Sequence, residues 1–147
     1  SPFNVGARVT MEDLTRADVT DLNERYGRPL RSEGEVDAYC QLLGGQPYLT
    51  HRGLYEMATQ PIGLQALAAA AQSGEGIFSE HLGRLVLMLS ENRELCEAVR
   101  NVMHGRPCPS NDCYQRLWSA GVFTGGSARE ARLRCELYGR YLEQRLP

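Results

Sequence analysis

The sequence predicts a mostly α protein, in which a helical bundle is followed by a winged helix with a small β-hairpin. Three observations predict this fold class. Apolar residues recur at helical spacing through most of the chain. A single corner, Gly44-Gly45-Gln46-Pro47, separates two of these periodic runs within the bundle. After residue 121 the pattern changes to two short extended runs around a glycine-rich turn, and a last helical run follows.

The composition is that of a folded globular protein, because 42% of the 147 residues are hydrophobic and 23% are charged. No apolar run approaches the roughly 20 residues of a membrane-spanning helix. We therefore expect a cytoplasmic protein without a membrane partner. The five cysteines are odd in number and lack paired short spacings, which favours reduced thiols and predicts neither disulfides nor a metal site.

The charge is unevenly distributed along the chain. Residues 1–76 hold 6 arginines against 10 acidic residues, a net charge of −4. Residues 77–147 hold 10 arginines against 8 acidic residues, a net charge of +2. This excess is far below the basic stripe of a dedicated nucleic-acid-binding protein.

The first two helices are predicted from their start and stop signals, after an extended connector or edge strand at residues 3–11. Thr15 and Ser32 are favourable N-cap residues. Each has an acidic residue three positions later, Asp18 or Glu35, as in a capping box. A glycine then follows each apolar-periodic run, at the position where a helix commonly ends.

The third helix begins at the glycine–proline corner. Gly44 and Gly45 suit a helix C-terminus because the residue after a helix often has a positive φ. Pro47 suits the first turn of the next helix. Backbone N–H groups at a helix start lack intrahelical partners and carry a partial positive charge, so the corner suits an anion or a polar ligand. The alternative is a helix–helix turn without a ligand.

The bundle is completed by two further apolar runs. The third helix carries apolar residues at four positions, Leu49, Leu54, Tyr55 and Ala58. Pro61 ends it, and a fourth helix extends from Leu64 to about Ser73. Ser73-Gly74-Glu75-Gly76 is a small-residue linker, which predicts a domain boundary between residues 15–73 and residues 77–147.

The second domain has the element order of a winged helix, namely three helices, a hairpin and a last helix. Helices are predicted at residues 77–89, 91–103 and 111–120, with a proline-rich turn at residues 105–109. Strands are predicted at residues 121–124 and 131–134, and the last helix at residues 136–146.

The chain also resembles the C-terminal half of the bacterial AAA-like NTPase family, of the STAND type. Gly45-Gln46-Pro47 looks like the GxP motif in the helical lid of these ATPases. The other matching landmarks keep their order along the chain: Ser1-Pro2-Phe3-Asn4-Val5-Gly6, residues 44–55, residues 76–82, Arg134-Cys135-Glu136-Leu137-Tyr138 and Tyr141-Leu142. The resemblance implies that residues 1–14 leave a separate nucleotide-binding core, residues 15–73 form a helical lid and residues 77–147 form the winged helix.

The resemblance further implies a nucleotide site shared with that core. Gly45, Gln46 and Pro47 would lie against the nucleotide, with Asn4 near it. Arg52, in preference to His51, would reach the phosphates as a sensor-type cation. A solvated surface arginine is the alternative. ATP or ADP with Mg²⁺ is implied for the parent protein, whereas no cofactor is expected for this chain alone.

The chain contains no lysine, so it cannot supply the Gly-Lys-Ser/Thr end of a phosphate-binding loop. We therefore expect no catalytic residues and no nucleotide hydrolysis by this chain alone. The predicted role is regulatory: lid and winged helix close over nucleotide held by the P-loop core. They would relay its state to an effector domain or to a protein partner, and a homo-oligomer is a further candidate assembly.

The alternative function is a stand-alone winged-helix adaptor that binds DNA or protein without nucleotide. For DNA, the candidate phosphate contacts are arginines near the helix predicted at residues 111–120 and near the hairpin: Arg106, Arg116, Arg129, Arg132 and Arg134. The helix predicted at residues 111–120 is nearly neutral on its polar face, which does not favour DNA. The resemblance implies intramolecular or protein contacts instead, since winged helices of this ATPase class often make them. His81 and His104 are isolated, and a packed or solvated role is predicted for both.

Overall fold

The computed structural model describes residues 12–146, and the connector predicted at residues 3–11, with Asn4, lies outside them. The described chain holds eight α-helices, one short 3-10 helix and a two-stranded antiparallel hairpin. The mostly helical class with a small hairpin is therefore confirmed. None of the helices within residues 12–146 has both the length and the apolar composition needed to cross a membrane.

The first four helices are α1 (Arg16–Arg25), α2 (Glu33–Leu43), α3 (Pro47–Thr59) and α4 (Leu64–Ala71). They are the four helices predicted for this part of the chain. Thr15 and Asp18 form a reciprocal capping box at α1. Ser32 accepts the Glu35 N–H at the start of α2, but the Glu35 carboxylate accepts the N–H of Arg31 instead of closing the box. The N-cap residues in the sequence therefore correctly predicted where both helices begin.

The inner face of α3 differs from the prediction. Tyr55 and Ala58 are exposed, whereas Thr50 and Gly53 face the core. The reason is the buried Tyr39 of α2, which lies against Gly53 and donates its hydroxyl to the Thr50 carbonyl oxygen at 2.7 Å. An apolar pattern cannot reveal that a glycine and a threonine face the core, since neither contributes a large apolar side chain.

The second half contains α5 (Ser79–Ser90), α6 (Arg93–Met103), α7 (Asn111–Ser119) and α8 (Glu136–Arg145). Strands β1 (Phe123–Thr124) and β2 (Arg132–Leu133) pair antiparallel, with the 3-10 helix η1 (Ala128–Glu130) in the loop between them. Helices α5 and α6 start two residues later than predicted, and Asn92 caps α6 by accepting the Leu95 N–H. The winged-helix assignment and the domain boundary stay predictions.

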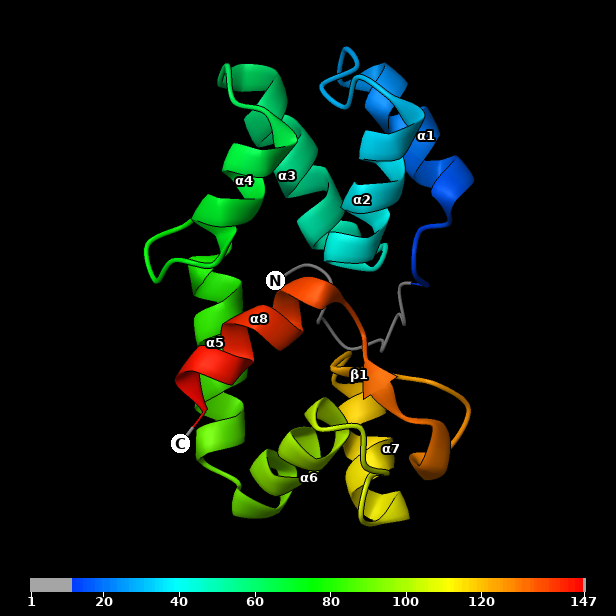
Figure 1. The fold of residues 1–147 in the computed structure, drawn as a ribbon, viewed down its shortest axis with the longest axis vertical. Coiled ribbons are helices and arrows are strands. Elements are labelled where there is room, and N and C mark those ends of the chain that lie inside the picture. The colour runs from blue at the N-terminus through cyan, green and yellow to red at the C-terminus, as the bar shows by residue number, and fades with distance from the viewer. Residues whose placement is uncertain (1–11, 147) are drawn as a thin grey trace, which may run out of the picture.

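The C-terminal helix α8 crosses the middle of the molecule (Figure 1). It packs against both α2 and α5, and its apolar side chains belong to one contiguous hydrophobic core. At its end, the Arg145 guanidinium lies 3.9 Å from the centre of the Tyr141 ring and donates to the carbonyl oxygen of Gln72, the C-cap of α4. Helix α8 therefore connects the first four helices to the elements that follow them.

Candidate functional site

The glycine–proline corner is a meeting point of three chain segments. Gly44 and Gly45 have φ values of +61° and +68°, which favour glycine. A Cβ on Gly44 would lie 2.5 Å from the Arg134 carbonyl oxygen, and a Cβ on Gly45 would overlap the carbonyl oxygen of Leu14. Leu14 also donates its N–H to the Gly45 carbonyl oxygen at 2.7 Å. The corner is thus packed between the segment entering α1 and the segment leaving the hairpin.

The start of α3 offers fewer free amides than predicted. Pro47 is buried at its first position, and Gln46 is the N-cap. The side-chain oxygen of Gln46 accepts the N–H of Leu49 at 2.6 Å, so the protein itself pairs one of the amides expected to face a ligand. Glutamine is not among the favoured N-cap residues, which is why the sequence did not reveal this contact.

The outward face of α3 carries exposed aromatic side chains and an arginine. Tyr48 and Tyr55 are 49% and 50% exposed. The Arg52 guanidinium lies 5.9 Å from the centre of the Tyr55 ring and pairs with Glu56 at 3.4 Å. His51 shares a hydrogen bond of 3.2 Å with the Tyr26 hydroxyl. Arg52 is therefore at the surface, and its contact with phosphate stays a prediction.

Sequence reasoning missed an aromatic stack beside the corner. The His81 ring lies between Tyr48 and Tyr138, with centroid distances of 5.7 and 6.0 Å and interplanar angles of 25° and 18°. Its Nε2 atom lies 2.8 Å from the Tyr138 hydroxyl. The stack joins α3, α5 and α8, and it gives His81 a packed role. Only the fold brings these residues together, because their sequence positions share no local pattern.

The partly buried position of His81 predicts a dependence of stability on pH. Burial, with a smaller effect of Arg84, lowers the pKa of His81 from 6.5. The unfolded chain then binds the proton more readily than the folded chain. We expect the free energy of unfolding to fall as the pH is lowered through 6.5 towards the folded-state pKa. Urea unfolding between about pH 7.5 and pH 5 should show a smaller loss for His81→Phe than for the wild type.

The matched control for this prediction is His104→Gln. His104 is an exposed residue at the C-terminal end of α6, and its Nδ1 lies 2.8 Å from the Arg100 carbonyl oxygen. This variant should keep the wild-type loss of stability at low pH. An equal loss in His81→Phe and the wild type would contradict the assignment to His81.

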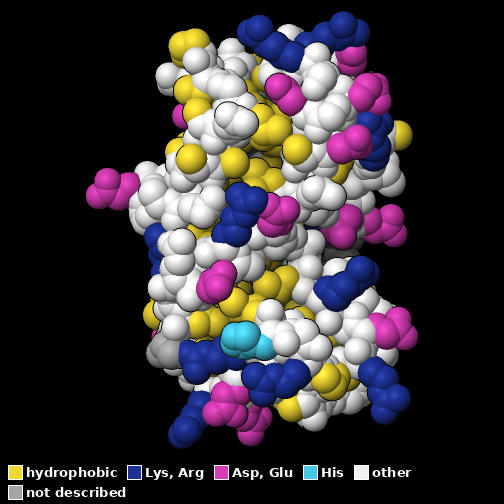
Figure 2. Space-filling model, viewed as in Figure 1, with side chains coloured by type: hydrophobic (Ala, Val, Ile, Leu, Met, Phe, Trp, Pro, Cys, Tyr) yellow, Lys and Arg dark blue, Asp and Glu magenta, His cyan; other side chains and the backbone are white. Residues whose placement is uncertain are grey.

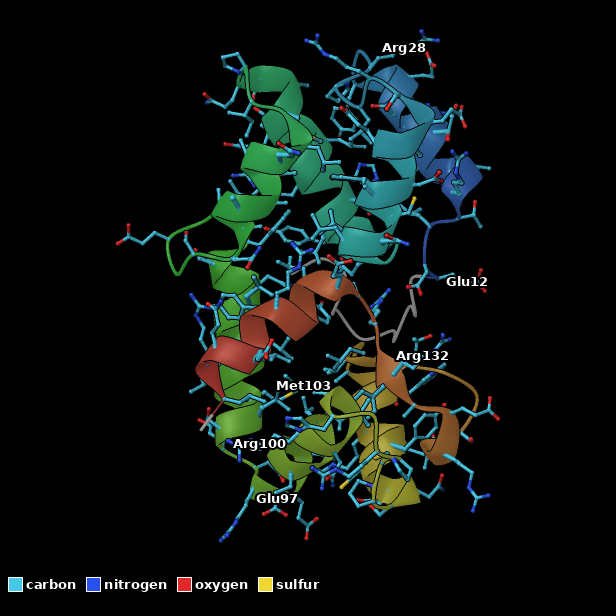
Figure 3. All side chains as sticks on the ribbon, viewed as in Figure 1. Glu12, Arg28, Glu97, Arg100, Met103 and Arg132 are labelled. Carbon is cyan, nitrogen blue, oxygen red and sulfur yellow. The ribbon has the colours of Figure 1, made fainter. Side chains whose placement is uncertain are left out.

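The five arginines considered for phosphate contacts lie in different environments. Arg106, Arg129 and Arg132 are exposed, and Figure 3 shows Arg132 projecting from the hairpin. Arg116 is exposed and lies 3.8 Å from Asp112. Arg134 differs because it is mostly buried and pairs with Asp13. A DNA contact by Arg134 would require breaking that pair, and DNA binding by the other four stays a prediction.

The described residues hold no metal cluster, and their groove lies away from the predicted site residues. No group of three or more His, Cys, Asp or Glu side chains within residues 12–146 could hold a metal ion. A shallow groove of about 390 Å³ lies between α2, α4 and α8. Figure 2 shows apolar side chains in the hollow between α2 and α4. None of the predicted site residues lines this groove.

Fold and site together define a mostly helical module organised around a glycine–proline corner. The chain matches the model of the AAA-like domain family over residues 1–144, and it belongs to that family. It has no significant match among curated proteins or solved structures. The AAA-like part of the resemblance is therefore confirmed, and its STAND-type, lid and winged-helix details stay predictions.

Proposed function

We propose that this chain is the regulatory lid portion of an AAA-type ATPase. Residues 15–73 form the helical lid and residues 77–147 a winged helix, and both close over ATP or ADP held by a separate P-loop core. Membership of the AAA-like family over residues 1–144 supports this proposal. The absence of lysine supports a regulatory role over catalysis, since a phosphate-binding loop needs that residue.

The double contact of the corner is the observation that carries the proposal. Gly45 touches Leu14, which precedes α1, and Gly44 touches Arg134 at the end of the hairpin. Packed segments of this kind move together or repack, because a close-packed interior does not deform continuously. A displacement of the segment before α1 would therefore be passed through the corner to the hairpin and α8.

The residues on the lid side fit one part of a nucleotide site. The exposed Tyr48 ring suits stacking, and the Arg52 guanidinium suits phosphate oxygens. The described residues offer no cluster of carboxylates for Mg²⁺. The metal, which would neutralise phosphate charge when bound, is accordingly assigned to the separate core.

This proposal predicts a nucleotide-binding defect in Arg52→Ala. In a protein that carries this chain together with its nucleotide-binding core, we expect affinity for ATP or ADP to fall about tenfold, because a charge-assisted hydrogen bond is lost. Stability should change by less than about 0.5 kcal/mol, since the Arg52–Glu56 pair is near the surface. Titration calorimetry and urea unfolding measure the two effects.

Arg25→Ala is the matched control. Arg25 is an exposed arginine that also pairs with an acid one turn away, Asp21, at 3.1 Å. It lies at the C-terminal end of α1 and should leave nucleotide affinity unchanged. Equal nucleotide affinity in Arg52→Ala and the wild type would remove Arg52 from the site.

A further inference from the structure

Arg134 is a mostly buried cation with an incomplete set of hydrogen bonds. It lies between β2 and α8, and its side chain is 14% exposed. Its Nη2 atom donates to the Asp13 carboxylate. Its Nε atom is buried and has no hydrogen-bond partner within the described part of the chain. Because a buried charged donor without an acceptor is unfavourable, this guanidinium can take one more acceptor than it has.

Apart from Asp13, the neighbouring groups do not neutralise this guanidinium. Cys135 is buried, and burial raises the pKa of its thiol to about 11, so that it carries no charge at neutral pH. The Glu136 carboxylate pairs with Arg140. Gly121 lies next to the Nη1 atom of Arg134 and has no side chain that could accept a hydrogen bond from it. Within residues 12–146, Asp13 is the one carboxylate that pairs with Arg134.

The Asp13 carboxylate can move away from Arg134 without a change in the neighbouring backbone. The Asp13 side chain is 50% exposed, whereas the next residue, Leu14, is held by its hydrogen bond to Gly45. The carboxylate can therefore rotate towards solvent while the backbone of Leu14 stays in place. Its departure would free the Nη2 atom of Arg134, which lies with the unpaired Nε atom on one edge of the planar guanidinium. That edge matches two oxygens of a phosphate group.

We propose that Arg134 is a binding site for a phosphate-type oxyanion and that Asp13 occupies this site as an internal competitor. Two oxygens of the anion accept from Nε and Nη2, and they replace the carboxylate of Asp13. Binding of the anion also breaks the ion pair that joins the segment before α1 to Arg134 at the end of the hairpin. This pair lies beside the corner, because Arg134 packs against Gly44. The anion is free phosphate or a nucleotide phosphate, and the inference does not depend on the proposed function.

The test is titration calorimetry of inorganic phosphate and pyrophosphate, with ADP in a separate arm, at matched ionic strength. Asp13→Asn should bind phosphate about five- to tenfold more tightly than the wild type, because the competing charge is gone. Arg134→Gln should bind at least about tenfold more weakly. Arg93→Gln is the control, since Arg93 is an exposed arginine of α6 that is assigned to no binding site, and it should bind as the wild type does.

Two further variants test the proposed anion site even if Arg134→Gln fails to fold. Asp13 is half exposed, so Asp13→Asn tests the competition in a folded protein. Arg134→Lys keeps the charge but loses the planar edge, and it should also bind more weakly. Phosphate binding by Asp13→Asn that is no tighter than that of the wild type would overturn the proposal.

The ADP arm distinguishes this site from the proposed function. Phosphate binding that requires Arg134, together with no ADP binding in a protein that carries the nucleotide-binding core, would support the site and contradict the proposed function. ADP binding that requires Arg134 would assign the site to a nucleotide phosphate. ADP and phosphate binding that are both unchanged in Arg134→Gln would overturn the site and leave the proposed function standing.

Discussion

Replacing Gly45 by alanine is expected to destabilise the protein by about 3 kcal/mol or more. The residue has a φ of +68°, which costs an L-residue about 1–2 kcal/mol. In addition, the new Cβ would overlap the backbone of Leu14, which cannot move aside without losing its hydrogen bond to Gly45. Urea unfolding of Gly45→Ala and the wild type measures the difference in free energy.

Gly27→Ala separates the two causes. Gly27 also has a positive φ, of +87°, but a Cβ there would meet no atom within 4 Å. Only the conformational cost remains, so we expect a loss of about 1 kcal/mol. Equal losses in Gly27→Ala and Gly45→Ala would show that the corner is not closely packed against Leu14.

Gly53→Ala is expected to destabilise the protein by about 2–3 kcal/mol, although helix propensity alone favours alanine by about 1 kcal/mol. Gly53 lies inside α3, and a Cβ there would overlap the Tyr39 hydroxyl and lie 3.2 Å from its Cζ atom. Tyr39 is 1% exposed, and its hydroxyl is hydrogen-bonded to Thr50, so the ring has no free space to enter. Urea unfolding measures this loss.

Two further variants test the cause of that loss. Gly83→Ala lies inside α5, where a Cβ would meet nothing within 4 Å, and it should stabilise the protein by about 0.5–1 kcal/mol. Tyr39→Phe removes the overlapping hydroxyl and should recover part of the loss in the Gly53→Ala background. A Gly53→Ala variant as stable as the wild type would contradict the contact.

The helix positions were predictable because their determinants are local. Thr15 and Ser32 each accept a backbone N–H three residues later, and the sequence alone shows that spacing. Gly44 adopts the left-handed conformation expected after a helix, and Pro47 occupies the first position of the next helix. The hairpin after residue 121 followed from glycines between two extended runs.

The site was less predictable because its contacts join distant positions. The corner was interpreted as a set of free amides, yet Leu14 and Arg134 pack against its glycines and Gln46 pairs one amide. Such contacts depend on how the helices pack, which periodicity does not determine. The stack around His81 and the burial of Arg134 were missed for the same reason.

The central claim is that the corner and its two contacts respond to nucleotide held by a separate core. Amide hydrogen exchange in a protein that carries this chain with that core, with and without ADP, tests it most directly. We predict altered exchange in residues 12–15, 44–55 and 134–138, and unchanged exchange in α7. Bound ADP with unchanged exchange throughout residues 12–146 would contradict the claim.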